Sequence, residues 1–66
     1  MVWTIEFNDG RTQTYDYIKE VHKDEQVYKA PFNNLSLLFS GTVTFIHTDG
    51  RQTTINGDKV KAIIIG

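Results

Sequence analysis

Cysteine is absent from this chain of 66 residues, which excludes disulfide bonds and metal sites built from thiolates. A chain of this length forms one domain near the lower size limit for folding alone. Domains this small often add a disulfide, a metal or a partner to their limited core. We therefore expect a single domain over residues 1–66, stabilised by good packing or by self-association.

Long apolar runs and clustered charge are also missing. No run approaches the roughly 20 apolar residues of a membrane span, and the N-terminus has neither the basic nor the apolar region of a signal peptide. These absences predict a soluble cytoplasmic protein with no membrane partner. The net charge is −1, and acidic and basic residues are interspersed. The basic face of a duplex-binding protein is therefore not indicated.

Known catalytic motifs are missing as well. The chain contains no P-loop, no dinucleotide-binding glycine pattern, no zinc-protease motif and no nucleophile elbow. A metal site would need both His22 and His47, and we expect these side chains on a sheet surface or rim. The adjacent carboxylates of Asp24 and Glu25 lie in a polar stretch, which predicts a solvated hairpin tip. We therefore predict a non-enzyme with no catalytic residues, metal, cofactor or small-molecule substrate.

What the chain does contain is a repeated pattern. An apolar stretch, Asp-Gly-Arg and a Thr/Gln-rich stretch occur near the start and again 40 positions later. Apolar residues alternate with polar ones before each Asp-Gly pair, which indicates half-buried strands joined by a tight turn. The repeat predicts two similar hairpins, at about 2–18 and 42–56.

The register of these hairpins follows from the apolar residues. A three-residue loop aligns apolar partners in both copies, setting Trp3 opposite Tyr15 and Val43 opposite Ile55, whereas a two-residue loop does not. A slip of one residue would move one strand's side chains to the other face. The sequence therefore favours a type I turn followed by a left-handed glycine, a G1 bulge. The predicted structural turn glycines are Gly10 and Gly50, together with Gly57 in the tail.

The tail predicts a third turn and a last strand. Asn56-Gly57 suits a two-residue type I′ loop, which would pair Thr53 with Val60. In that register Val60, Ala62 and Ile64 face the core. Ile63 and Ile65 then point the other way. A strand that is apolar on both faces is central, curled into a barrel or covered by another subunit.

The middle of the chain is more ambiguous. We favour a hairpin that turns near 23–25, with a strand near 26–30 that Pro31 ends, because proline cannot donate to a ladder. Residues 33–39 fit a short helical turn capped by Asn33 or Asn34, with Leu35, Leu38 and Phe39 inward and Gly41 at its end. They also alternate well enough for a strand.

Together these patterns predict an all-β fold. We expect an antiparallel meander of five or six strands, forming a small SH3-like or OB-like barrel or a curled sheet, with one short helical turn near 33–39 as an option. The stretch 44–65 resembles a hairpin-plus-strand pattern of small bacterial and phage β proteins. The small size also suggests a phage or mobile-element origin.

The apolar tail favours protein–protein interaction as the function. A terminal strand can pair with another chain, so Ile63 and Ile65 are the predicted interface. The partner would be a second copy in a homodimer or a larger protein for which this chain is an adaptor or inhibitor. The alternative is a barrel that binds single-stranded nucleic acid weakly by stacking bases on tyrosines beside lysines. The residues for that role are Tyr15, Tyr17, Tyr28, Lys19 and Lys29.

Overall fold

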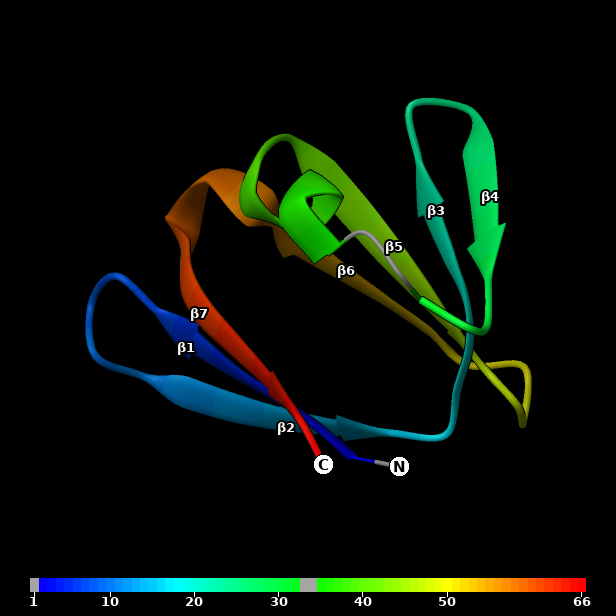
Figure 1. The fold of residues 1–66 in the computed structure, drawn as a ribbon, viewed down its shortest axis with the longest axis horizontal. Coiled ribbons are helices and arrows are strands. Elements are labelled where there is room, and N and C mark those ends of the chain that lie inside the picture. Colours follow the sequence, from blue (N-terminus) through cyan, green and yellow to red (C-terminus); the bar gives the residue numbers. More distant parts are fainter. Residues whose placement is uncertain (1, 33–34) are drawn as a thin grey trace.

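The structure is all-β, and buried residues alternate with more exposed ones along its strands β1 and β5. The computed structural model describes residues 2–32 and 35–66, which form seven strands and two short 3₁₀ helical turns (Figure 1). The prediction of an all-β meander is confirmed, although the count of five or six strands was too low. The elements are β1 (Val2–Phe7), β2 (Thr12–Asp16), β3 (Ile18–Lys23), β4 (Gln26–Lys29), η1 (Leu35–Phe39), β5 (Thr42–His47), β6 (Gln52–Asn56), η2 (Gly57–Lys59) and β7 (Val60–Ile65).

The strands form two antiparallel sheets. One sheet has the order β2-β1-β7 and the other has the order β4-β3-β5-β6. The predicted registers of the two similar hairpins are confirmed, because Trp3 lies opposite Tyr15 and Val43 lies opposite Ile55. Both turn glycines, Gly10 and Gly50, have a φ of +91°, which a residue with a Cβ adopts only with strain.

The chain passes from the first sheet to the second at Tyr17. This residue lies between β2 and β3 and has a φ of +54°. Its carbonyl oxygen accepts a hydrogen bond of 2.8 Å from the backbone N–H of Thr48, so the bend is fastened to the turn between β5 and β6. The two sheets therefore curl over one another rather than stack as separate layers (Figure 1).

The hairpin predicted in the middle of the chain is confirmed. β3 and β4 pair around Asp24 and Glu25, whose φ values of +52° and +66° indicate a type I′ turn. β4 ends at Lys29, ahead of Pro31, as predicted. The 3₁₀ turn η1 confirms the helical alternative over its described residues, whereas the capping proposed for Asn33 or Asn34 lies outside them.

Two expectations about side chains near η1 and in the tail were wrong. Phe39 is exposed, so only Leu38 of η1 is fully inward. In β7 Val60 is buried as predicted, but beyond the register shift opposite Glu6 and Phe7 the faces are reversed. Ile64 is 67% exposed, and Ile63 and Ile65 pack partly against the core. The reason is the pairing, because β7 lies beside β1, with Ile63 opposite Ile5, and not beside β6.

The predicted type I′ loop at Asn56-Gly57 was also wrong. The Asn56 side chain accepts a 3.0 Å hydrogen bond from the backbone N–H of Asp58, so it caps η2. Position 57 has no room for a side chain, because a Cβ there would lie 2.8 Å from the carbonyl oxygen of Leu38 and from the backbone of Ser40. The tail thus turns through η2 against η1 before it reaches β1.

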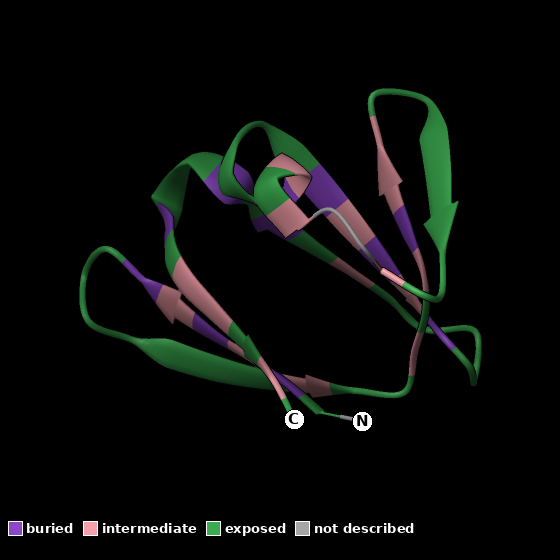
Figure 2. Ribbon diagram, in the orientation of Figure 1, coloured by how far each residue is buried: buried purple, intermediate pink, exposed green. Residues whose placement is uncertain are grey.

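The core lies between the inner faces of the two curled sheets, where the buried residues gather (Figure 2). Trp3 is its centre, with its ring edge-on to Phe45 at 5.6 Å between centroids and to Phe32 at 5.1 Å. Such edge-to-face pairs add to the energy of burial. The remaining buried apolar residues are Ile5, Phe7, Val21, Leu38, Val43, Ile55 and Val60.

Candidate functional site

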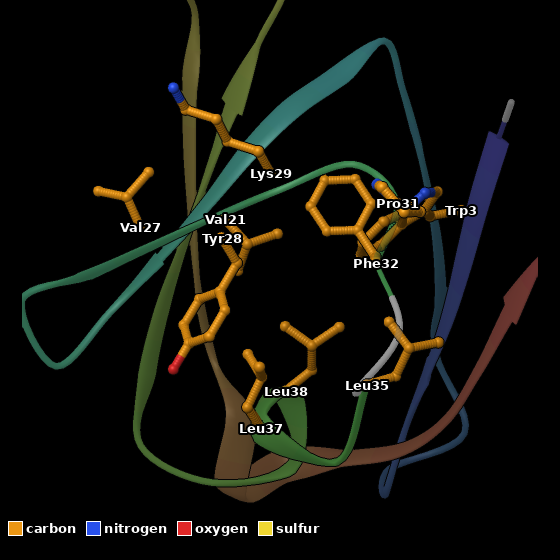
Figure 3. A pocket seen from close by; sticks show the side chains of 10 residues that line it. All are labelled: Trp3, Val21, Val27, Tyr28, Lys29, Pro31, Phe32, Leu35, Leu37 and Leu38. Atoms are coloured by element: carbon orange, nitrogen blue, oxygen red, sulfur yellow. The ribbon is translucent and has the colours of Figure 1, made fainter.

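An apolar pocket of about 230 Å³ opens beside β4 and η1 (Figure 3). Its deepest residues, Trp3, Val21 and Leu38, are each at most 1% exposed. Side chains from β4, from the segment after it and from η1 surround this floor. They are Val27, Tyr28, Lys29, Pro31, Phe32, Leu35 and Leu37. We call this site the β4–η1 pocket.

The η1 side of the β4–η1 pocket is held by polar contacts. The ammonium group of Lys23 donates to the carbonyl oxygen of Leu37 and, at 2.9 Å, to the hydroxyl of Ser40. On the far side of η1, the backbone N–H of Gly41 donates to the carboxylate of Asp58 at 3.1 Å. These bonds join β3, η1 and η2, so one wall of the pocket is fixed in place.

The other wall is an edge strand. β4 pairs with β3 at one edge of its sheet, and all of its residues are exposed. The two-residue loop makes Lys23 and Gln26 the first hydrogen-bonded pair. Hydrogen-bonded and non-bonded pairs alternate along an antiparallel ladder. The backbone N–H and C=O groups of Val27 and Lys29 therefore point to the free edge, beside the pocket.

One cationic residue of β4 borders the pocket, with its side chain directed to the outer face of the strand (Figure 3). Lys29 is the charged residue among the described lining residues, and its side chain is 72% exposed. Its ammonium group is 3.8 Å from one carboxylate oxygen of Glu20, while the other oxygen is 2.9 Å from Nε2 of His22. The hydrogen bond from His22 is the main cause that lowers the pKa of the Glu20 carboxyl, which stays ionised.

The tyrosines and lysines proposed for nucleic-acid stacking lie in three places. Tyr28 and Lys29 line the β4–η1 pocket. Tyr15 packs against Phe45, with centroids 5.4 Å apart, and burial raises the pKa of its hydroxyl. Exposed Tyr17 lies at the bend between the sheets, near Lys19 in the chain. Nucleic-acid binding stays a prediction, without a common aromatic surface to support it.

The interface predicted at Ile63 and Ile65 also stays a prediction. β7 lies at one edge of its sheet, but the side chains of these two residues are turned partly inward. Ile64, between them, is a large apolar side chain of β7 that is exposed to solvent. Any contact through β7 would therefore use the backbone edge and Ile64.

His47 is buried, contrary to the expectation of a surface or rim position. Its Nδ1 lies 2.7 Å from the carbonyl oxygen of Asp16, and a carbonyl only accepts, so Nδ1 carries a proton. Nε2 lies 2.8 Å from the Thr53 hydroxyl, within hydrogen-bonding distance. Both ring nitrogens are occupied by structural bonds. Within residues 2–32 and 35–66, no group of three or more His, Asp or Glu side chains is arranged to hold a metal.

A second cavity, of about 290 Å³, lies between β2 and β6. Polar and charged side chains form much of its lining, including Arg11, Gln13 and Lys59. Arg11 is also engaged, through its Nε, with the carboxylate of Asp9 at 2.6 Å. Because charged and polar side chains line so much of this cavity, the β4–η1 pocket is the better candidate for binding an apolar group.

Sequence reasoning missed most of the β4–η1 pocket. Its lining comes from β1, β3, β4, the segment after β4 and η1, which no local pattern connects. One signal was present: the apolar residues of 32–39 are too many for one short turn to bury.

None of the described helices is long and apolar enough to cross a membrane. Comparisons with protein-family models, curated proteins and solved structures find no match to this chain.

Proposed function

We propose that this protein is a non-enzymatic binding module that takes an extended segment of another protein along the free edge of β4. One apolar side chain of that segment would enter the β4–η1 pocket. The observation that carries the proposal is the adjacency of an apolar pocket and an unpaired strand edge. In the cell the chain would act as an adaptor or a small inhibitor of a larger protein.

Strand addition fits the chemistry of this edge. An added strand gains backbone hydrogen bonds along the edge and specificity from pockets that receive alternate side chains. On β4 the groups of Val27 and Lys29 supply the hydrogen bonds. A residue opposite Tyr28 would point to the same face as Tyr28, which pairs with buried Val21. Its side chain would therefore enter the pocket.

The size of the pocket supports a single side chain as its occupant. At about 230 Å³ it is smaller than the roughly 300–1,000 Å³ of typical small-molecule sites. Its lining of Leu, Phe, Val and Trp side chains matches an aliphatic or aromatic group. The exposed apolar surface of Val27 and Tyr28 beside it would be covered by the added strand, which removes the liability of an open edge.

The test uses short peptides with Gln-Leu-Val at the centre, with threonine on each side. In the antiparallel register proposed, Gln lies opposite Lys29, Leu opposite Tyr28 and Val opposite Val27. Binding would be followed by the fluorescence of Trp3, the single tryptophan, which lines the pocket. We expect saturable binding that is lost when the peptide leucine is replaced by serine.

N-methylation of the peptide separates strand addition from simple apolar contact. The N–H of the peptide valine would donate to β4, whereas that of the leucine points away. Methylation at valine should therefore abolish binding, and methylation at leucine should leave most of it. Equal effects of the two methyl groups would contradict strand addition at β4.

A further inference from the structure

We infer that the segment bound at β4 carries a carboxylate directly before the apolar residue that enters the pocket. The inference rests on the proposed function and specifies the chemistry of the partner. Its basis is the charge on β4 beside the pocket: Lys29 is the charged residue among the described lining residues, and its ammonium group lies with Glu20 on the outer face of β4. An apolar pocket with one cation selects an apolar group with an adjacent anion.

Lys29 is available to an incoming anion. Over the described residues its one carboxylate neighbour within 4 Å is Glu20, at 3.8 Å, which is long for a charge-assisted hydrogen bond. Glu20 already has a closer partner in His22, at 2.9 Å. The exposed ammonium group thus keeps most of its capacity to pair with a carboxylate of the added strand.

Strand geometry gives the position of that carboxylate. Successive side chains of a strand point to opposite faces, and residues directly opposite share a face. Lys29 lies on the face opposite that of Tyr28. In the antiparallel register, the residue opposite Lys29 comes one position before the residue opposite Tyr28. The carboxylate therefore immediately precedes the pocket residue, as in Glu-Leu-Val.

Charges at the other end of β4 set the direction of the bound segment. Asp24 and Glu25 form the hairpin tip and would repel an acidic residue there. A parallel segment would carry its acidic end toward this tip when its leucine occupies the pocket. The arrangement of Lys29 at one end and two carboxylates at the other thus favours the antiparallel direction.

The experiment compares three peptides that differ at one position: Glu-Leu-Val, Gln-Leu-Val and Lys-Leu-Val, each flanked by threonines. Each would be titrated into the wild type and into Lys29→Glu, with Trp3 fluorescence as the readout. We expect the wild type to bind the glutamate peptide about 1.5- to fivefold more tightly than the glutamine peptide, the range for an exposed cross-strand ion pair. Salt should reduce this difference.

Lys29→Glu should reverse the order, so that the lysine peptide binds most tightly. The matched control is Lys19→Glu, which makes the same charge change on an exposed residue of β3 that does not line the pocket. It should preserve the wild-type order. Circular dichroism and urea unfolding would verify that both variants fold.

The outcomes separate the two proposals. If all three peptides bind equally to the wild type and to Lys29→Glu, the carboxylate inference is wrong and strand addition stands. If none binds, the proposed function is wrong with it. Sedimentation completes the test: a dimer that binds none of the peptides would overturn the inference together with the proposed function.

Discussion

The two Asp-Gly-Arg hairpins share one turn but have different roles in the fold. In each turn the glycine N–H donates to the carbonyl oxygen three residues earlier, at 2.9 Å in the first and 3.0 Å in the second. In each, the aspartate also accepts from the arginine N–H two residues later, at 2.9 Å and 3.0 Å. The turn geometry is therefore a local property of the shared sequence.

The difference lies in the last strand residue before each turn. In the first hairpin this is Phe7, which packs into the core and has the guanidinium of Arg11 5.7 Å from its ring centre. In the second it is His47, 2% exposed, which bonds to Asp16 at the end of β2. At this equivalent position, Phe7 of the first hairpin makes an apolar contact with the core, whereas His47 of the second makes a polar link between the two sheets.

The residues that follow the two hairpins also differ: Tyr17 follows the first and Gly57 follows the second. Among the variants that test this comparison, Gly57→Ala should cause the largest loss of stability. Its Cβ would lie 2.8 Å from three backbone atoms of Leu38 and Ser40, so the backbone must move. Overpacking of this kind typically costs about 1–3 kcal/mol, and we expect a loss near 3 kcal/mol in urea unfolding.

The matched change after the first hairpin is Tyr17→Gly, where a left-handed residue is 66% exposed. Glycine adopts this conformation without strain, so stability should change little or rise. A larger loss of stability for Tyr17→Gly than for Gly57→Ala would show that the bend at Tyr17 contributes more to stability than the contact of η2 with η1.

His47→Phe would make the second hairpin resemble the first, and it should have the next largest effect. The Asp16 carbonyl and the Thr53 hydroxyl would lose their ring partners. An unpaired polar group in a partly buried site costs about 1–3 kcal/mol, so we expect a loss of about 2 kcal/mol by urea unfolding.

Adding Thr53→Val to His47→Phe removes the unpaired Thr53 hydroxyl and should recover part of the lost stability. Additive losses from Thr53→Val and His47→Phe would contradict a hydrogen bond between the two side chains.

Local sequence was sufficient for the two hairpins and insufficient for what joins them. Asp-Gly and the alternation of Trp3 and Ile5 determined the turn and the register, because both depend on neighbours in the chain. The partner of β7 is a long-range choice between β1 and β6, and a strand apolar on both faces fits either. The β4–η1 pocket was beyond prediction for the same reason, since its walls come from separate segments.

Gly10→Ala and Gly50→Ala should have smaller effects that equal one another. Both glycines have a φ of +91°, and a Cβ added to either would meet no atom of another segment within 4 Å. The cost is therefore backbone strain alone, about 1 kcal/mol. The double variant should lose the sum of the two. A difference of more than about 0.5 kcal/mol between the single variants would show that the turns are coupled differently to the sheets.

The smallest effect concerns the turn carboxylates. The backbone N–H of Arg11 is the main cause that lowers the pKa of Asp9 below its ordinary 3.8, and that of Arg51 does the same for Asp49. A carboxyl with a lowered pKa in the folded state stabilises the fold above its unfolded pKa. That contribution is lost as the pH falls below 3.8 and through the folded pKa.

Replacing both turn aspartates by asparagine should therefore flatten the pH dependence of unfolding as the pH falls below 3.8. The side chains are exposed, so water and salt weaken the effect. Each single variant should give half of the change, because the two turns are alike. If the unfolding free energy of the double variant changes with pH in the same way as that of the wild type across this range, the two carboxylates titrate identically in the folded and unfolded chains. The shared turn would then owe its geometry to glycine alone.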